Sequence, residues 1–335
     1  MRAYVMERYG DAGGSRLRDM PAPPPPAAGE VQVAIRAAGL NPVDFKFRQG
    51  KLRVIMRPEL PVILGNEIAG EVVATGPGVT RFQPGERVFA RLAKDGGGGF
   101  AERANVEAAF LAHSPASIDD SAAAGVPLAG LTALQALRDI LKVGPGQRVL
   151  ISGGAGGVGT LAIQIAKWLG AHVTTTASAR GEALVRSLGA DAVIDYTTQR
   201  IADLPRDFDA GFDLIGGATL REMFGVVKPG GTVVSISDVP EPQTALTDLG
   251  RGWGLAALFW AVSLPIRAQA RRAGVRYRFL FMRPDGEGLA LLARLIDEGR
   301  LRTTTDRVFP LDEAPAAMAY LEAGRAKGKV VLSIT

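Results

Sequence analysis

The chain has 335 residues, of which 47% are hydrophobic and 22% charged, and its formal net charge is +5. This length allows two ordinary domains with hydrophobic cores, and the balance is that of a globular protein. The absence of cysteine excludes disulfides, thiolate catalysis and cysteine-bound zinc or iron–sulfur clusters. The two histidines, His113 and His172, have no carboxylate at ligand spacing, so we expect no metal site.

The N-terminal segment MRAYVMERYG carries charges and no apolar core, which argues against a secretory signal. Residues 1–120 have the pattern of β-structure, because short runs rich in Val and Ile, such as 30–40 and 68–79, are separated by Gly and Pro. The proline run at 21–26 predicts an extended surface connection, since a strand pattern resumes at Val31.

From about residue 121 the pattern changes to an alternation of helices and strands. Residues 121–141 predict a helix that ends before Gly144-Pro145-Gly146. The following βαβα order predicts an α/β fold with a doubly wound parallel sheet and right-handed crossovers, whose last strand is 278–282. Residues 289–301 predict a further helix, and 328–334 predict a final strand.

Two neighbouring segments have unusual composition. Residues 252–266 are apolar, but the stretch is shorter than the ~20 residues that cross a bilayer and it contains Pro265. We expect a buried helix, a lid or an interface element there, no membrane span, and a cytoplasmic protein by default. The basic run 267–278 contains one aromatic residue, which favours a solvated helix face over a nucleic-acid site.

The motif G-x-G-x-x-G occurs at Gly154, Gly156 and Gly159, directly after the apolar strand 148–152 and directly before a helix. In this context the first glycine permits a tight turn, the second lets the backbone approach a pyrophosphate, and the third lets the helix pack on the strand. The helix N-terminus adds unpaired N–H groups and a positive dipole end. The pattern therefore predicts a dinucleotide site.

About 20 residues further on, such sites commonly carry an acidic residue that binds the adenosine ribose and repels a 2′-phosphate. The polar residues at this place are Thr174, Thr175, Thr176, Ser178 and Arg180. The nearest acidic residue, Glu182, belongs to the next helix. Hydroxyl groups and a guanidinium suit a phosphate, so the sequence predicts NADP(H) as the cofactor.

The chain resembles the zinc-free quinone oxidoreductase branch of the medium-chain dehydrogenase/reductase family almost from end to end. The segments that carry the resemblance are AAGLNPVDFKFRQG, LGNEIAGEVVATGPGVTRFQPGERV, PLAGLTALQAL, SGGAGGVG, LGADAVIDY and KGKVVL. The resemblance implies a β-rich, GroES-like catalytic domain formed by residues 1–120 and 291–335. It also implies a Rossmann NADP-binding domain over residues 121–290.

The resemblance also assigns roles to single residues. Zinc-dependent relatives have a Cys where this chain has Asn41 and a His where it has Asn66, and neutral amides are poor Zn²⁺ ligands. Without a Lewis acid, alcohol oxidation loses its main source of rate, so reduction of an electrophilic acceptor is favoured. The resemblance places Asn41 and Thr132 beside the nicotinamide as the catalytic residues. Asn41 is equally explained as a turn residue before Pro42, and Thr132 as an ordinary helix residue.

The remaining cofactor residues follow from the same resemblance. The pyrophosphate would lie on Gly154, Ala155, Gly156, Gly157 and Val158. Ser178, Arg180 and Tyr196 would surround the 2′-phosphate and adenosine, although Tyr196 also fits a strand-end aromatic. Phe281 and Lys329 would close over the cofactor. Asp44 and Arg48 are expected to form a structural pair.

These residues predict an NADPH-dependent enzyme that transfers a hydride to a quinone or an α,β-unsaturated carbonyl. Enoyl-thioester reductases of the family place a proton-donating Tyr soon after the N-P-x-D segment, and this chain has no Tyr between Tyr9 and Tyr196. The alternative is a non-catalytic NADPH-binding protein that binds nucleic acid through residues 267–278. Family members are commonly dimers, so we expect a homodimer with a small-molecule substrate and no nucleic acid.

Overall fold

The computed structural model describes residues 1–93 and 97–334. The chain divides into two compact units, one made of Met1–Leu131 with Pro284–Thr335 and one made of Thr132–Arg283. We call them the first and the second unit. The change of pattern near residue 121 marks the start of α2 (Asp120–Ala124), which packs against strands β3 and β5 and belongs to the first unit.

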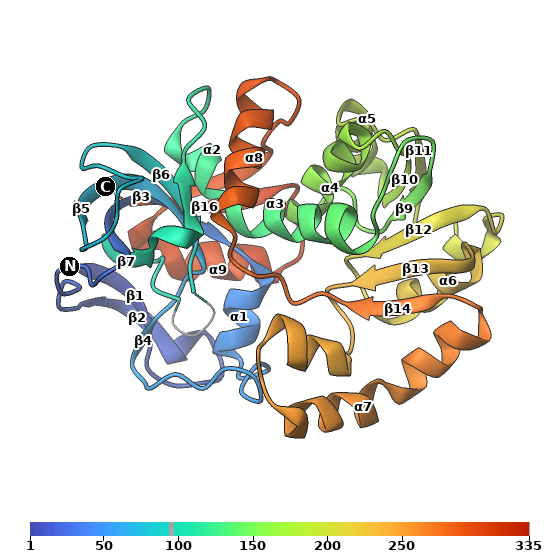
Figure 1. The fold of residues 1–335 in the computed structure, drawn as a ribbon, viewed down its shortest axis with the longest axis horizontal. Coiled ribbons are helices and arrows are strands. Elements are labelled where there is room, and N and C mark those ends of the chain that lie inside the picture. Colours follow the sequence, from blue (N-terminus) through green and yellow to red (C-terminus); the bar gives the residue numbers. More distant parts are fainter. Residues whose placement is uncertain (94–96, 335) are drawn as a thin grey trace. The chain divides into compact units, whose positions relative to one another are not determined.

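The first unit is rich in β-structure (Figure 1). One sheet has the order β15-β16-β3-β5-β6-β8, with β7 also paired to β3, and a smaller sheet has the order β2-β1-β4. The strands are β1 (Arg2–Met6), β2 (Ser15–Asp19), β3 (Glu30–Leu40), β4 (Val62–Ile63), β5 (Glu67–Thr75), β6 (Arg87–Arg91), β7 (Arg103–Glu107), β8 (Leu111–His113), β15 (Thr305–Pro310) and β16 (Lys329–Ser333). The α-helices that lie wholly in this unit besides α2 are α1 (Pro42–Arg48), α8 (Gly286–Asp297) and α9 (Ala314–Glu322).

Strand β3 is the centre of the larger sheet and is buried over most of its length. Its first half pairs with β7, its second half with β16, and β5 pairs along both halves with register shifts that bend the strand. The antiparallel register pairs Leu40 of β3 with Val330 of β16. Because Asn41 and Lys329 are the next residues of the two strands, the sheet brings the two chain ends together there.

The second unit contains the expected parallel sheet, in the order β11-β10-β9-β12-β13-β14. The strands are β9 (Arg148–Ile151), β10 (His172–Ala177), β11 (Ala192–Asp195), β12 (Phe208–Asp213), β13 (Val227–Ser235) and β14 (Arg276–Phe279). The helices are α4 (Gly157–Trp168), α5 (Ala179–Ser187), α6 (Gly217–Val226) and α7 (Trp253–Arg272). Helices α4 and α5 pack against β9, β10 and β11, and α6 and α7 pack against β12, β13 and β14 (Figure 1). The predicted α/β fold class is confirmed.

The predicted bounds of the helix over 121–141 and of the last parallel strand differ from the structure. The helix expected over 121–141 is divided into α2 and α3 (Pro127–Leu134) and continues as a π-helical turn over Gln135–Ile140. Pro127 has no N–H to donate to the preceding turn, so it begins a new helix. The last parallel strand begins at Arg276, because Gly274, with a φ of 72°, ends α7 just before it and lets pairing with β13 start early.

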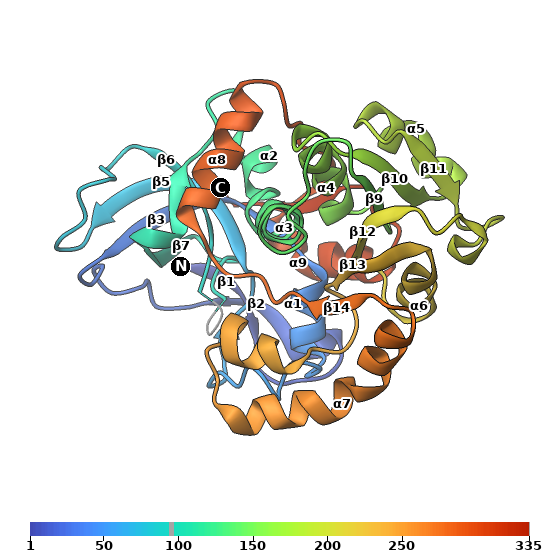
Figure 2. The same cartoon turned by 45° about the vertical axis from the view of Figure 1, so that its right-hand side comes forward.

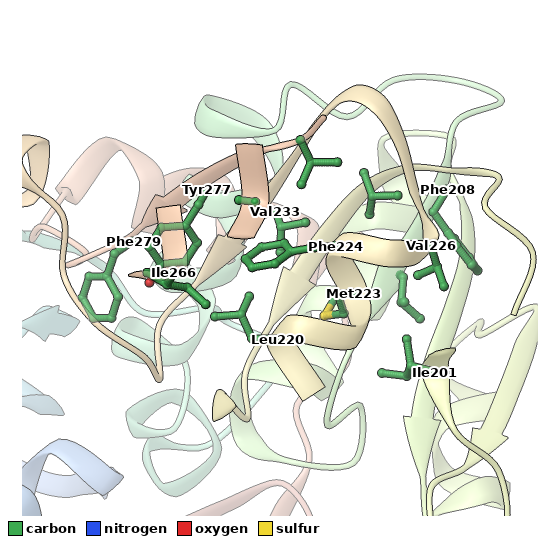
Figure 3. Packing of buried hydrophobic residues seen from close by; sticks show 14 of the residues in the cluster. Ile201, Phe208, Leu220, Met223, Phe224, Val226, Val233, Ile266, Tyr277 and Phe279 are labelled. Carbon is green, nitrogen blue, oxygen red and sulfur yellow. The ribbon is translucent and has the colours of Figure 1, made fainter. Parts of the chain in front are cut away.

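A hydrophobic cluster holds α6 and α7 against the sheet of the second unit (Figure 3). Phe224 of α6 and Tyr277 of β14 meet edge to face with ring centroids 6.1 Å apart, a geometry that aromatic pairs favour. Ile266 and Ala270 of α7 join the same cluster.

The apolar segment 252–266 forms most of α7, which runs past the edge strand β14 (Figure 2). It is not the buried helix considered from the sequence, because only one stripe of it faces the core and most of its other residues are exposed. Within the described parts of the chain, no helix combines the length and apolar character needed to cross a membrane.

Candidate functional site

The loop between β9 and α4 has the geometry of a phosphate cradle. Gly153 has a φ of 68°, so the tight turn falls on this glycine and not on Gly154 as the motif predicted. A Cβ on Gly154 would lie 2.2 Å from Oγ1 of Thr175, and one on Gly159 would lie 2.3 Å from the Gly153 carbonyl oxygen. A Cβ on Gly156 would meet only that oxygen, at 3.4 Å. Packing thus requires glycine at positions 154 and 159, whereas the protein leaves space beside Gly156.

Helix α4 begins at the open part of this loop, with Gly156 as its N-cap. The Thr160 N–H bonds the Gly156 carbonyl oxygen at 2.9 Å, so the amides of Gly157, Val158 and Gly159 precede the first intrahelical bond. These amides and the positive end of the helix dipole suit an anion. The residues present therefore fit the pyrophosphate of a dinucleotide.

The threonines of β10 hold this loop and are not part of a phosphate site, which corrects the prediction. Thr174, Thr175 and Thr176 are buried, because β10 lies inside the sheet between β9 and β11. The Gly153 N–H bonds Thr176 Oγ1 at 2.8 Å, and the Thr175 hydroxyl donates to the Ile151 carbonyl at 2.8 Å. The hydroxyls of Thr175 and Thr176 thus bond the end of β9 and the loop that follows it.

The ends of β10 and β11 place the predicted adenosine residues side by side. Ala177 pairs with Asp195 in the parallel register, so Ser178 and Tyr196 follow at the same edge of the sheet. Ser178 is the N-cap of α5 and its side chain makes no capping bond, while Tyr196 is 62% exposed. Arg180, the second residue of α5, is also exposed. These three residues follow the C-terminal ends of β10 and β11.

Sequence reasoning missed an acidic residue at this edge. The Asp195 carboxylate accepts hydrogen bonds from the N–H and hydroxyl of Thr197 at 3.0 and 2.7 Å. These bonds hold the pKa of Asp195 below its usual value. The segment VIDY was used only for Tyr196, although the position of Asp195 as the last residue of a parallel strand could have revealed it.

A second missed group lies where the strand order reverses, between β9 and β12. Asp213 is fully buried and accepts hydrogen bonds from the hydroxyls of Ser152 at 3.0 Å and Ser235 at 2.7 Å. It also accepts the Gly216 N–H at 3.0 Å. One carboxylate thus joins the ends of β9, β12 and β13, at the switch point where ligands bind to open α/β sheets.

The first unit contains a buried ionic cluster around Asn41. The Lys329 ammonium donates to the Leu40 carbonyl at 2.9 Å, to Asn41 Oδ1 at 2.5 Å and to Glu67 Oε1 at 2.7 Å. The Asn41 amide donates to the same Glu67 oxygen at 2.7 Å, and the Leu128 N–H donates to the other at 2.6 Å. Gly39 makes room for this carboxylate, because a Cβ there would lie 2.3 Å from Glu67 Oε1.

A neighbouring carboxylate completes the cluster. Asp44 caps its own helix by accepting the Asn41 N–H at 2.7 Å, and it accepts the Asn66 side-chain amide at 2.5 Å. Burial raises the pKa of Asp44 to about 6, although these bonds act in the opposite direction. The expected pair of Asp44 with Arg48 is wrong, since the Arg48 guanidinium bonds Glu322 at 2.7 Å while Asp44 turns toward the helix N-terminus.

The positions at which relatives bind zinc do not fit that metal here. Asn41 and Asn66 are neutral amides that already bond carboxylates, and the Lys329 ammonium occupies the carboxylate of Glu67. Zinc sites use thiolate, imidazole or carboxylate ligands. Among residues 1–93 and 97–334, no three His, Cys, Asp or Glu side chains gather closely enough to hold a metal ion.

The two other predicted residues lie in the second unit. Thr132 is a buried residue of α3. Phe281 is half-buried, packs against the hydrophobic cluster below β14, and its N–H donates to Asp248 at 3.2 Å. Asn41 and Lys329 belong to the first unit.

Comparison with known proteins agrees with this arrangement. The profile described as alcohol dehydrogenase GroES-like domain matches residues 27–116, and the one described as zinc-binding dehydrogenase matches residues 188–332. The chain is 34% identical to the quinone-oxidoreductase QR1 of Triphysaria versicolor, with 99% of this chain and 98% of that protein covered. It is 34% identical to the NADPH-dependent alkenal/one oxidoreductase of Arabidopsis thaliana, with 99% and 79% covered.

The structure of the quinone oxidoreductase from Coxiella burnetii has a TM-score of 0.85 and 31% identity, with 100% of this chain and 99% of that chain covered. A GroES-like unit and a Rossmann unit with a dinucleotide loop define a nicotinamide-dependent oxidoreductase. The chain belongs to the medium-chain dehydrogenase/reductase family, in its quinone oxidoreductase branch. The family predicted from the sequence is confirmed.

Proposed function

We propose that this protein is an NADPH-dependent reductase that transfers a hydride to a quinone or an α,β-unsaturated carbonyl without zinc. The observation that carries the choice of NADPH is the edge formed by Ser178, Arg180 and Tyr196. A guanidinium and a hydroxyl there would bind a 2′-phosphate. Asp195, the acidic residue of this edge, is engaged by Thr197.

The pyrophosphate would be held by the loop from Gly154 to Val158, including Ala155, Gly156 and Gly157. The support is the open position of Gly156 and the amides of Gly157, Val158 and Gly159, which precede the first intrahelical bond of α4. The N–H groups of Gly153 and Gly154 donate to the hydroxyl and the carbonyl oxygen of Thr176 and keep this backbone in place, so the loop would not need to rearrange on binding.

We propose Asn41 and Thr132 as the residues beside the nicotinamide, with Phe281 and Lys329 closing over the cofactor. The bound nicotinamide supplies the hydride. The Asn41 amide is oriented by Glu67 and Lys329 on its two sides. All three protons of the Lys329 ammonium have acceptors, so Lys329 would act on the cofactor by positioning Asn41.

The acceptor class follows from the donor groups that this chain offers. A quinone or enone is already electrophilic, so it needs hydrogen-bond donors and correct placement more than a metal. The reduced oxygens of a quinone can take protons from water, which agrees with the absence of a Tyr between Tyr9 and Tyr196. The related quinone and alkenal/one oxidoreductases support the same substrate classes.

A panel of benzoquinones, naphthoquinones and enones, assayed with NADPH and with NADH, tests this proposal. We expect turnover with NADPH, a strong preference over NADH, and unchanged activity after EDTA treatment. One zinc per chain by elemental analysis would contradict the metal-free mechanism. Failure to turn over any acceptor, together with salt-sensitive RNA binding, would favour the non-catalytic alternative.

The oligomeric state and the cellular compartment are further parts of the proposal. We propose a homodimer, which the family resemblance supports and sedimentation equilibrium tests. We propose the cytoplasm as the compartment, which fractionation of the source cells tests.

A further inference from the structure

Helix α7 presents an unusually apolar face to the outside. Its inward stripe is spaced by three and four residues and consists of Ala256, Phe259, Ser263, Ile266 and Ala270. Of the eleven large hydrophobic residues that are exposed in the described part of the chain, five lie on this helix. They are Trp253 (79% exposed), Leu258 (46%), Trp260 (53%), Val262 (47%) and Leu264 (44%). Contiguous exposed apolar surface of this kind marks an interaction site.

The sequence segment that contains this helix carries charge of one sign, and one of its arginines, Arg278, is paired with Glu241 of the preceding segment at 2.7 Å. Between Asp248 and Asp285 the sequence contains seven arginines and no acidic residue, which exceeds the net charge of +5 of the whole chain. The exposed members are Arg251, Arg271, Arg272, Arg276 and Arg283. Within the described ranges, neither Arg271 nor Arg272, at the C-terminal end of α7, has a carboxylate partner. The apolar face is therefore followed by positive charge at the C-terminal end of α7.

We propose that α7 binds an anionic lipid surface, lying in the plane of the interface. Apolar side chains would enter the boundary between headgroups and acyl chains, the indoles of Trp253 and Trp260 would lie at headgroup level, and the arginines would meet anionic headgroups. The helix is attached to the core along its inward stripe, so it contacts the bilayer from one side and does not span it.

Charge and polarity favour a lipid over other occupants. A second copy of the chain would bring the same arginines against these, with no acidic residue of α7 to compensate them. Nucleic acid would match the charge but not the uncharged face from Trp253 to Ile266. Tyr277, the aromatic residue of the run 267–278, is buried with its hydroxyl on the Val239 carbonyl, so it offers no ring for base stacking.

Tryptophan fluorescence can follow this binding directly. The chain has three tryptophans, and Trp168→Phe leaves only the two of α7. We expect a blue shift of emission on vesicles of phosphatidylglycerol and phosphatidylcholine, and co-sedimentation with them. Binding to pure phosphatidylcholine should be at least about tenfold weaker, and 0.5 M NaCl should weaken binding to the anionic vesicles, since surface attraction is screened by salt.

Two double variants separate the apolar and the electrostatic contributions. Leu258→Ser with Leu264→Ser, and Arg271→Gln with Arg272→Gln, should each weaken binding to the anionic vesicles by about tenfold or more. Val54→Ser with Val308→Ser, and Arg103→Gln with Arg325→Gln, change exposed residues of the first unit by the same substitutions and should leave binding unchanged. Unfolding curves of all variants verify that each is folded.

Four outcomes would overturn the proposal. One is absence of binding to the anionic vesicles. Another is an equal loss in the control pairs. The third is that the wild type does not bind vesicles and sediments as a dimer, and that Leu258→Ser with Leu264→Ser dissociates this dimer. That result would assign the face to a second copy. RNA binding that depends on Arg271 and Arg272 without vesicle binding would assign it to nucleic acid. None of these results depends on reductase activity.

Discussion

The ionic cluster of the first unit and the glycine loop of the second are both rich in polar groups, but they satisfy those groups differently. Around Glu67, the side-chain amide of Asn41, the ammonium of Lys329 and the backbone N–H of Leu128 all donate to the carboxylate of Glu67. At the start of α4, the amides of Gly157, Val158 and Gly159 precede the first helical hydrogen bond. The first arrangement stabilises a fold, and the second leaves donors for a ligand.

The difference gives a rule for which variants of this protein lose stability and which lose cofactor affinity alone. Changes in the cluster should lower the free energy of unfolding, because a buried charge without a partner is costly. Changes at the loop and at the adjacent edge should lower cofactor affinity with little effect on stability. Substitutions in the cluster and at the loop test the two halves of the rule.

Lys329→Met should have the largest effect. It leaves the carboxylate of Glu67, which is fully buried, without its cation. We expect a loss of about 3–5 kcal/mol in the free energy of unfolding, measured by urea titration. The double variant Lys329→Met with Glu67→Gln removes both charges and should recover most of this loss. A single variant as stable as the wild type would contradict a structural role for the cluster.

Asp44→Asn should remove a pH dependence of stability. Because the pKa of Asp44 is raised from 3.8 to about 6, the folded state binds a proton in a range where the unfolded state has lost it. Its contribution to the free energy of unfolding therefore falls as pH rises from about 4 to about 6, by about 3 kcal/mol in total, and is constant above. Urea titrations from pH 4 to 8 should show this fall in the wild type and lack it in the variant. Identical slopes would contradict the assignment.

Arg180→Ala should weaken NADPH binding by about ten- to a hundredfold, the loss of a charge-assisted hydrogen bond of about 1.5–3 kcal/mol. NADH binding should be almost unchanged, since NADH has no 2′-phosphate, and nicotinamide fluorescence titration measures both. Arg186→Ala, on the same helix and paired with Glu182, is the control and should change neither. Equal losses for the two cofactors in Arg180→Ala would show that this edge does not bind the phosphate.

Gly156→Ala and Gly159→Ala should have opposite profiles. Gly159→Ala places a Cβ against the backbone of Gly153 and should destabilise the fold by about 1–3 kcal/mol. Gly156→Ala has room for its Cβ in the protein and an ordinary φ of −81°, so stability should change by less than about 1 kcal/mol. It should nevertheless weaken NADPH binding. Equal stability losses in the two variants would contradict the distinction.

Local patterns in the sequence were sufficient for the dinucleotide loop. A strand, three spaced glycines and a helix are contiguous in the chain, so their geometry follows from neighbouring residues. Even there, the tight turn lies at Gly153 and not at Gly154 as predicted. Thr175 and Thr176, predicted as phosphate ligands, instead bond the backbone of β9 and of the loop. The burial of β10 by β9 and β11 decided this, and burial depends on which strands become neighbours.

The sequence by itself determined the α/β class, the parallel sheet and the glycine loop, because these depend on periodicity and spacing along the chain. Only the tertiary structure decided that Lys329 bonds Asn41, 288 residues away, and that Glu67 joins them across 26 residues. It also decided that α7 is exposed along one face. These bonds form at the edge of the sheet where β3 ends and β5 and β16 begin, and no local sequence pattern predicts which strands become neighbours there.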